Sequence, residues 1–186
     1  MKRNAPQNFR VSNVLDSLDR SSKGTILRSM AIFTAIELCG SFLTGSTGPT
    51  TTRKNFLAFC QSKYMPPAYD NIADLLYHIF RNGVSHSYVS KGAALLSSDS
   101  HDSRKHLKFY SNGLFIYVPR LAGDLTSSIR SFYQDIKSDT ALQKNYNDVI
   151  QQLDTDGSKQ YSQYLKDEGI TPIPRTIKRD IFTAIV

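Results

Sequence analysis

The spacing of apolar residues changes once along this chain, and that change limits the folds open to it. Most segments place apolar side chains three and four residues apart, the spacing of a helix with one buried face. Between His106 and Val118 the pattern becomes two short runs, HLKFY and LFIYV, separated by Ser111-Asn112-Gly113. Such runs around a turn with Asn-Gly are typical of a β-hairpin. The sequence therefore predicts a mainly α-helical bundle with one β-hairpin.

The helical spacing predicts six helices. They cover residues 11–20, 25–44, 53–64, 70–80, 121–137 and 141–153. We expect Thr25 and Asp70 to cap the second and fourth helices. Pro66-Pro67 is expected to end the third helix, and Pro119 to stop the second strand.

The fourth predicted helix has one apolar stripe. Its apolar residues follow the i, i+3, i+4, i+7, i+8 pattern of a buried face: Ile72, Leu75, Leu76, Ile79 and Phe80. Its other face carries Asp74, His78, Arg81 and Asn82. This arrangement predicts that polar and charged groups line the exposed side of the helix.

The length of 186 residues suits a single domain. We expect a core over about residues 11–153 and a C-terminal extension over 154–186. Met30–Leu43 is the most apolar stretch, but it is short for a membrane span and contains Glu37, which predicts a core helix. The polar N-terminus predicts no signal peptide. The two cysteines, Cys39 and Cys60, predict buried thiols in a reducing, cytoplasmic compartment.

The chain carries a formal net charge of +7, concentrated in its first third. Residues 1–63 hold nine Lys and Arg against three acidic residues. A basic surface attracts polyanions such as RNA through counterion release. Many basic soluble proteins bind no nucleic acid, so charge alone leaves both interpretations open.

A short motif at the end of the fourth predicted helix could carry chemistry. Arg81 and His86 are separated by four residues, Asn82-Gly83-Val84-Ser85. In an unbroken helix they would lie on different faces, but Gly83 allows the helix to loosen so that both side chains converge. Arginine suits phosphate binding and histidine exchanges protons near neutral pH. The alternative is that Arg81 interacts with the helix dipole and His86 bonds within a turn.

The segment LYHIFRNGVSHSYVSKG resembles the signature of the HEPN superfamily, in which Arg is often followed by Asn, Asp or His, and a His comes after four to six intervening residues. Arg81, Asn82 and His86 match that pattern. Tyr88 and Lys91-Gly92 are similar to residues that follow the motif in some bacterial members. The resemblance covers about residues 11–137.

The resemblance implies a HEPN-like helical bundle, often a homodimer that brings two motifs together. It implies a metal-independent endoribonuclease of a toxin–antitoxin or phage-defence type, acting on RNA without cofactors. His86 would be the general base toward the ribose 2′-hydroxyl, Arg81 would stabilise the phosphorane, and Asn82 would orient the site. Ser85, Tyr88, Lys91 and His78 are further candidate site residues.

Other candidate groups have simpler interpretations. His78 fits a solvent-exposed helix position as well as the site. His101, Asp102 and His106 are metal-ligand types, but without a second cluster they predict no zinc site. Basic and aromatic residues around the hairpin suit single-stranded nucleic acid, although strand alternation favours burial of the aromatic rings.

Two other functions stay open. The chain could be a catalytically silent HEPN-like module that binds RNA, a nucleotide or a protein without cutting. It could also act only beside a partner such as an antitoxin.

Overall fold

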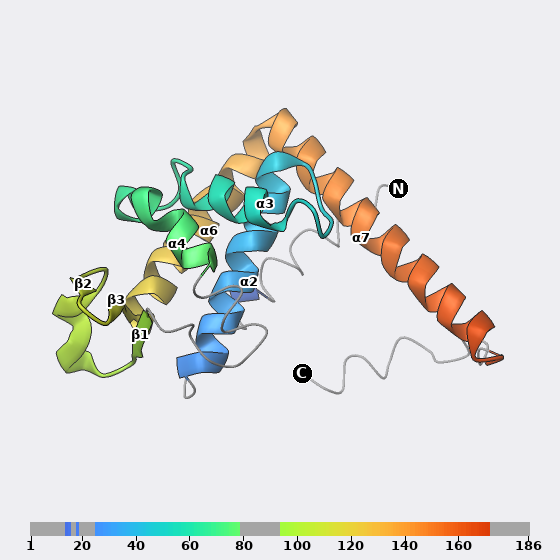
Figure 1. The fold of residues 1–186 in the computed structure, drawn as a ribbon. Helices are drawn as coiled ribbons and strands as arrows, with labels where there is room; N and C mark the ends of the chain where they lie inside the picture. Colours follow the sequence, from blue (N-terminus) through green and yellow to red (C-terminus); the bar gives the residue numbers. More distant parts are fainter. Residues whose placement is uncertain (1–13, 16–17, 19–24, 79–93, 172–186) are drawn as a thin grey trace, which may run out of the picture. The chain divides into compact units, whose positions relative to one another are not determined.

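A computed structural model describes residues 14–15, 18, 25–78 and 94–171 of the chain. The chain divides into two compact units, residues 1–149 and 150–186. The described elements are mainly helical, which confirms the predicted class; a HEPN-type bundle stays a prediction. In chain order the elements are α2 (Thr25–Thr44), α3 (Thr52–Cys60), the 3₁₀ helix η1 (Pro67–Ile72), α4 (Ala73–Leu76), β1 (Ala94–Ser97), the 3₁₀ helix η3 (Ser100–Lys105), β2 (Phe109–Tyr110), β3 (Gly113–Tyr117), α6 (Val118–Ser138) and α7 (Thr140–Asp167) (Figure 1).

Helix α2 is the central helix of the first unit, and its bounds match the prediction. Ile32, Phe33 and Ile36 are fully buried, and the helix contacts α3, α6 and β1. By length and hydropathy α2 could cross a membrane, yet half of its most apolar window is buried inside the protein. Core helices of soluble proteins pass the same test, so α2 is consistent with the predicted core helix.

Helix α3 packs on α2 at a point where the two backbones nearly touch. A Cβ atom at Gly40 would lie 1.8 Å from the backbone oxygen of Asn55. Glycine is therefore required at position 40. The predicted helix over 53–64 ends early, at Cys60, because the Ser62 hydroxyl donates to the Phe59 carbonyl (2.7 Å) and competes with further helical bonds.

The segment before the motif is helical, but not as one regular helix. Residues 67–72 form η1, residues 73–76 form α4, and residues 77–78 continue in a π-helical turn. The prediction that Asp70 caps this helix is wrong. Pro67 starts the helical turn three residues earlier, since its fixed φ suits a first position, and Asp70 lies within η1. Of the described part of the predicted stripe, Ile72 and Leu76 are buried and Leu75 is half-buried, while Asp74 and His78 are exposed as predicted.

The predicted hairpin is confirmed as β2 and β3, and it belongs to a three-stranded sheet. Strand β3 lies in the middle, antiparallel to β2 and parallel to β1. Strand β1 was not expected, because a four-residue run without alternation gives no periodic signal. Part of the predicted polar loop over 97–105 forms η3.

Helix α6 follows the sheet directly and confirms the helix predicted over 121–137. Pro119 lies in its first turn, where a missing N–H costs no helical bond. The buried face of α6 meets the aromatic core, in which Phe132 contacts both Phe59 and Tyr64. The buried residues at helical spacing are Leu121, Leu125, Ile129, Phe132 and Ile136.

Helix α7 is longer than predicted. The sequence predicts a helix that ends near Leu153, but α7 continues through Gly157 to Asp167. Helix-forming Lys and Gln residues outweigh the cost of a single interior glycine. Tyr146 and Val149, in the first unit, are buried, whereas residues 150–171 contain no buried side chain.

Candidate functional site

Most of the predicted site lies outside the described residues. This applies to Arg81, Asn82, Ser85, His86, Tyr88 and Lys91, which fall within residues 79–93. Their roles stay predictions. His78 is the one candidate site residue in the described part of the chain.

His78 lies on the surface in a small charged group at the end of the described helical segment. Its Nε2 is 3.4 Å from Asp74 Oδ1, and its side chain is 55% exposed. The same carboxylate oxygen accepts from Arg53 of α3, at 2.9 Å from Nε and 2.6 Å from Nη2. Arg53 and His78 therefore approach the same oxygen of Asp74. The expectation of an exposed histidine is confirmed.

A second titratable group joins three parts of the first unit. Tyr69 of η1 donates its hydroxyl proton to Asp124 Oδ2 of α6 (2.7 Å), and its oxygen lies 2.9 Å from His106 Nε2. His106 Nδ1 accepts from the backbone N–H of Tyr117 (3.1 Å). Since Nδ1 accepts, the neutral ring carries its proton on Nε2 and donates it to Tyr69.

The electrostatics of this group favour a neutral ring. Burial lowers the pKa of His106, and the positive charge of Arg120 lowers it further, against the opposing effect of Asp124. Burial and the bond to Asp124 raise the pKa of Tyr69. Both histidine nitrogens are engaged within the protein, so His106 is not available as a metal ligand. The Tyr69–His106–Asp124 group therefore connects elements and offers no free base.

Neither the histidines near η3 nor the cysteines form a metal site in the described residues. Across residues 14–15, 18, 25–78 and 94–171, no three His, Cys, Asp or Glu side chains come close enough to hold a metal ion. Asp102 instead accepts from Ser97 (2.6 Å) and Lys105 (2.6 Å). Cys39 and Cys60 are buried free thiols, as predicted. Burial raises the pKa of each to about 12, which leaves them protonated.

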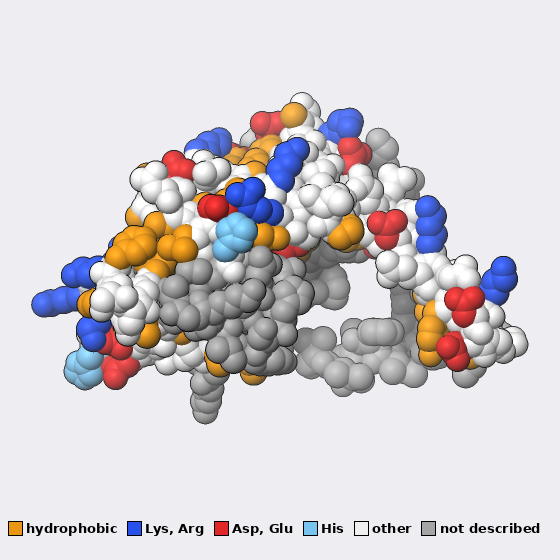
Figure 2. Space-filling model, in the orientation of Figure 1, with side chains coloured by type: hydrophobic (Ala, Val, Ile, Leu, Met, Phe, Trp, Pro, Cys, Tyr) orange, Lys and Arg blue, Asp and Glu red, His pale blue; other side chains and the backbone are white. Residues whose placement is uncertain are grey.

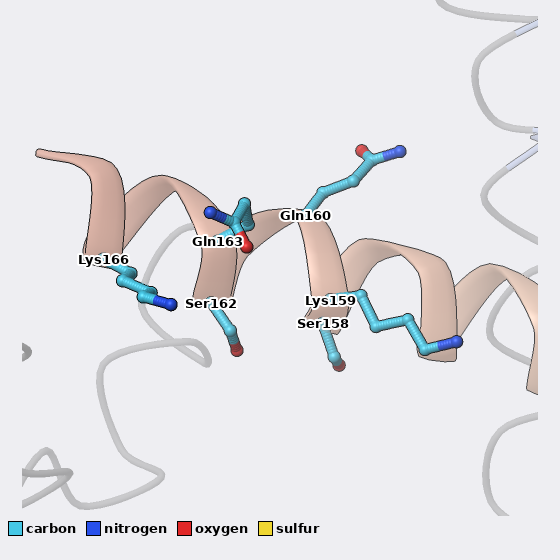
Figure 3. A pocket seen from close by; sticks show the side chains of 6 residues that line it. All are labelled: Ser158, Lys159, Gln160, Ser162, Gln163 and Lys166. Carbon is cyan, nitrogen blue, oxygen red and sulfur yellow. The ribbon is translucent and has the colours of Figure 1, made fainter.

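An open hollow lies along the described part of the second unit. All six lining residues belong to α7, and they are Ser158, Lys159, Gln160, Ser162, Gln163 and Lys166. Figure 3 shows Gln160 and Ser162 pointing to opposite sides of the helix. Side chains that diverge from a single helix cannot enclose a ligand.

The aromatic side chains of the hairpin are less buried than the sequence predicts. Strand alternation predicts buried aromatic rings, and in β3 Leu114, Phe115 and Ile116 are indeed buried. In β2 the prediction is wrong, because Phe109 is 64% exposed and Tyr110 is 44% exposed.

A β-bulge accompanies this exposure. Leu107 N–H donates to the Phe115 carbonyl (2.8 Å), and Phe115 N–H donates to the Lys108 carbonyl (2.9 Å). Leu107 and Lys108 therefore both lie opposite Phe115, which interrupts the in–out alternation of side chains at this point. Leu107 adopts a left-handed backbone conformation with φ of 60°. Since β2 is also a two-residue edge strand, its rings have no second neighbour in the sheet.

Basic side chains surround these exposed rings. Figure 2 shows Lys and Arg side chains gathered over η3 and β2. We call the surface formed by Arg104, Lys105, Lys108, Phe109 and Tyr110 the hairpin surface; all five residues are exposed. The sequence showed the residue types, but it did not predict that the two rings are exposed.

Comparisons of the chain with protein-family models, curated proteins and solved structures found no match.

Proposed function

We propose that this protein is a metal-independent endoribonuclease of the HEPN type. The observation that carries the proposal is the spacing of Arg81, Asn82 and His86 directly after an apolar helical stripe. The mainly helical fold and the basic net charge support it. In the described residues just before the motif, Ile72 and Leu76 are buried and Asp74 and His78 are exposed.

The chemistry follows from the two side chains. His86 takes the proton of a ribose 2′-hydroxyl, and the 2′-oxygen attacks the adjacent phosphorus. Arg81 stabilises the negative charge that grows on the phosphoryl oxygens. The 5′-oxygen leaves and takes a proton, so the products carry a 2′,3′-cyclic phosphate and a 5′-hydroxyl. Asn82 orients the site, and Ser85, Tyr88, Lys91 and His78 contribute to RNA binding.

The assembly belongs to the same proposal. A homodimer would bring two motifs together and double the positive charge that faces one RNA strand. The protein would act in the cytoplasm, with an antitoxin as a further partner. Light scattering on the purified chain measures the expected dimer mass.

The test is a ribonuclease assay in EDTA, with the parent beside Arg81→Ala and His86→Ala. Loss of a general base lowers such rates by about 10²- to 10⁴-fold, and loss of a charge-stabilising donor by about 10²- to 10³-fold. His101→Ala and Arg130→Ala are matched controls, because both residues are exposed and lie in η3 and α6. Circular dichroism checks that each variant is folded.

The outcomes separate the two classes of function. The enzyme is supported if the parent and both control variants cleave RNA and leave cyclic-phosphate ends, while Arg81→Ala and His86→Ala do not cleave. RNA binding without cleavage would instead support a silent binding module. Cleavage by His86→Ala at the parent rate would contradict the proposed mechanism.

A further inference from the structure

We infer that the hairpin surface binds single-stranded RNA, with bases stacked on Phe109 and Tyr110 and phosphates paired with the neighbouring basic side chains. The choice of RNA rests on the proposed function. The aromatic and basic side chains of the surface themselves suit a polyanionic nucleic-acid strand with unpaired bases. The surface is formed by residues of η3, residues of β2 and Lys108 between them, and it shares no residue with the predicted motif.

The exposed rings are the first observation. Phe109 is 64% exposed, the largest fraction among the exposed large hydrophobic side chains described, and it has no polar atom to bond water. Tyr110 beside it is held in place, because its ring contacts the buried Phe115 ring with centroids 6.1 Å apart. A ring held from below and open above can stack with a nucleic-acid base.

The charges around these rings are the second observation. Lys105 is bonded to Asp102 (2.6 Å), and its Nζ also lies 5.5 Å from the Phe115 ring centroid. Arg104 and Lys108 are exposed and form no ion pair within the described part of the chain. Both cations are therefore available to phosphates. Lys108 directly precedes the two exposed rings in the chain, so cation and rings lie close together.

The geometry favours a single strand over the other polyanions and partners. In duplex RNA the base faces are stacked on each other and cannot reach Phe109. A protein strand added to the sheet edge would find only two β2 residues to pair with. Exposed aromatic rings next to unpaired cations are instead the feature shared by surfaces that follow single strands.

The test measures binding apart from cleavage. The full chain carrying His86→Ala is titrated against a fluorescein-labelled ten-nucleotide oligouridine in EDTA, and anisotropy is recorded at several salt concentrations. Phe109→Leu and Tyr110→Leu keep an apolar side chain but remove the ring, and each is expected to weaken binding about fivefold or more. Phe109→Tyr keeps the ring and is expected to bind like the parent. Lys108→Ala is expected to reduce the salt slope by about 0.7.

Matched controls come from the second unit. Tyr161→Leu removes a ring that is 60% exposed, close to the exposure of Phe109, and Lys159→Ala removes an exposed charge from the same helix. Both are expected to change affinity less than twofold. Any of three results would overturn the inference: a loss of affinity in Tyr161→Leu as large as in Phe109→Leu, unchanged affinity in Phe109→Leu, or duplex RNA bound as tightly as oligouridine.

The failures of the two proposals are distinguishable. If cleavage depends on His86 but binding is unchanged by Phe109→Leu, the ribonuclease proposal stands and the inference about the hairpin surface is wrong. Binding that depends on Phe109, with no cleavage by any variant, leaves the hairpin surface on a binding module.

Discussion

At the scale of single residues, Gly40 allows the backbone of α2 to lie directly against the backbone of α3 at Asn55. The Asn55 side chain is buried at this point and satisfies its polar atoms within the protein. Its amide donates to Ser41 Oγ (3.0 Å) and to the Ser46 carbonyl (2.9 Å), and its Oδ1 accepts from Thr44 (2.8 Å). A small residue and a bonded polar residue together allow the backbones to meet.

Gly40→Ala should destabilise the first unit strongly. The new methyl group would overlap the Asn55 backbone, and overpacking that forces the backbone to shift costs about 1–3 kcal/mol, and occasionally more. Gly123→Ala in α6 is the matched control, because nothing lies within 4 Å of its added Cβ, and it should stabilise the protein by about 0.5–1 kcal/mol. Urea unfolding of both variants measures the difference. Equal effects of the two changes would disprove the close approach.

Asn55→Ala should destabilise the protein by about 2–4 kcal/mol, because several buried bonds are lost at once. Asn112→Ala removes an asparagine from the exposed turn between β2 and β3 and should change stability by less than about 0.5 kcal/mol. Thermal unfolding followed by circular dichroism makes the comparison. A small effect at position 55 would mean that the Asn55 bonds add little to stability.

At the scale of elements, the Tyr69–His106–Asp124 group ties η1 and α6 to the segment that leads into β2. Tyr69 has almost no exposed surface, so its hydroxyl must find partners inside the protein. Asp124 and His106 provide them from positions 55 and 37 residues away in the chain. The group therefore fixes the hairpin surface relative to the helices of the first unit.

The lowered pKa of His106 predicts that stability falls in acid. The unfolded chain takes up a proton at His106 near pH 6.5, while the folded chain resists it until its own lower pKa is reached. This contribution is therefore fully present above about pH 6.5 and is lost as pH falls toward the folded pKa. The slope for one proton is at most about 1.4 kcal/mol per pH unit.

His106→Asn isolates that contribution, since its side-chain oxygen can still accept from the Tyr117 N–H but does not titrate. The free energy of unfolding, measured by urea titration from pH 7.5 to 5, should depend less on pH in this variant than in the parent. His101→Asn is the control, because His101 is exposed. If the free energy of unfolding depends on pH equally in the parent and in His106→Asn, His106 is not the source of that dependence.

At the scale of the whole molecule, the described core is confined to the first unit. Residues 150–171 of the second unit bury no side chain, and Tyr161 and Tyr164 are mostly exposed. A helix without a packed face adds little to the free energy of unfolding, because most helical stability comes from tertiary packing.

A chain that ends after Leu153 should therefore unfold with nearly the parent's free energy, within about 1 kcal/mol. The unfolding free energy of the shortened chain should also depend slightly less steeply on urea concentration, because less surface becomes exposed on unfolding. Urea titrations of the full and shortened chains test this directly. A loss of several kcal/mol would show that residues after 153 contribute to the core.

The sequence by itself determined the mainly helical class, the bounds of α2, the position of the hairpin and the buried face of α6. These features depend on apolar spacing and on prolines within a few residues of one another, so local physics is enough. The sequence also singled out Arg81 and His86, whose role stays a prediction.

Only the tertiary structure decided which distant residues meet. The parallel pairing of β1 with β3 and the group around Tyr69 join segments whose separation in the chain has no periodic signature. The exposure of Phe109 was likewise mispredicted, because alternation assumes that one face of the strand is covered, whereas both residues of the short edge strand β2 are exposed. Burial depends on what packs against a residue, and that is settled by the fold as a whole.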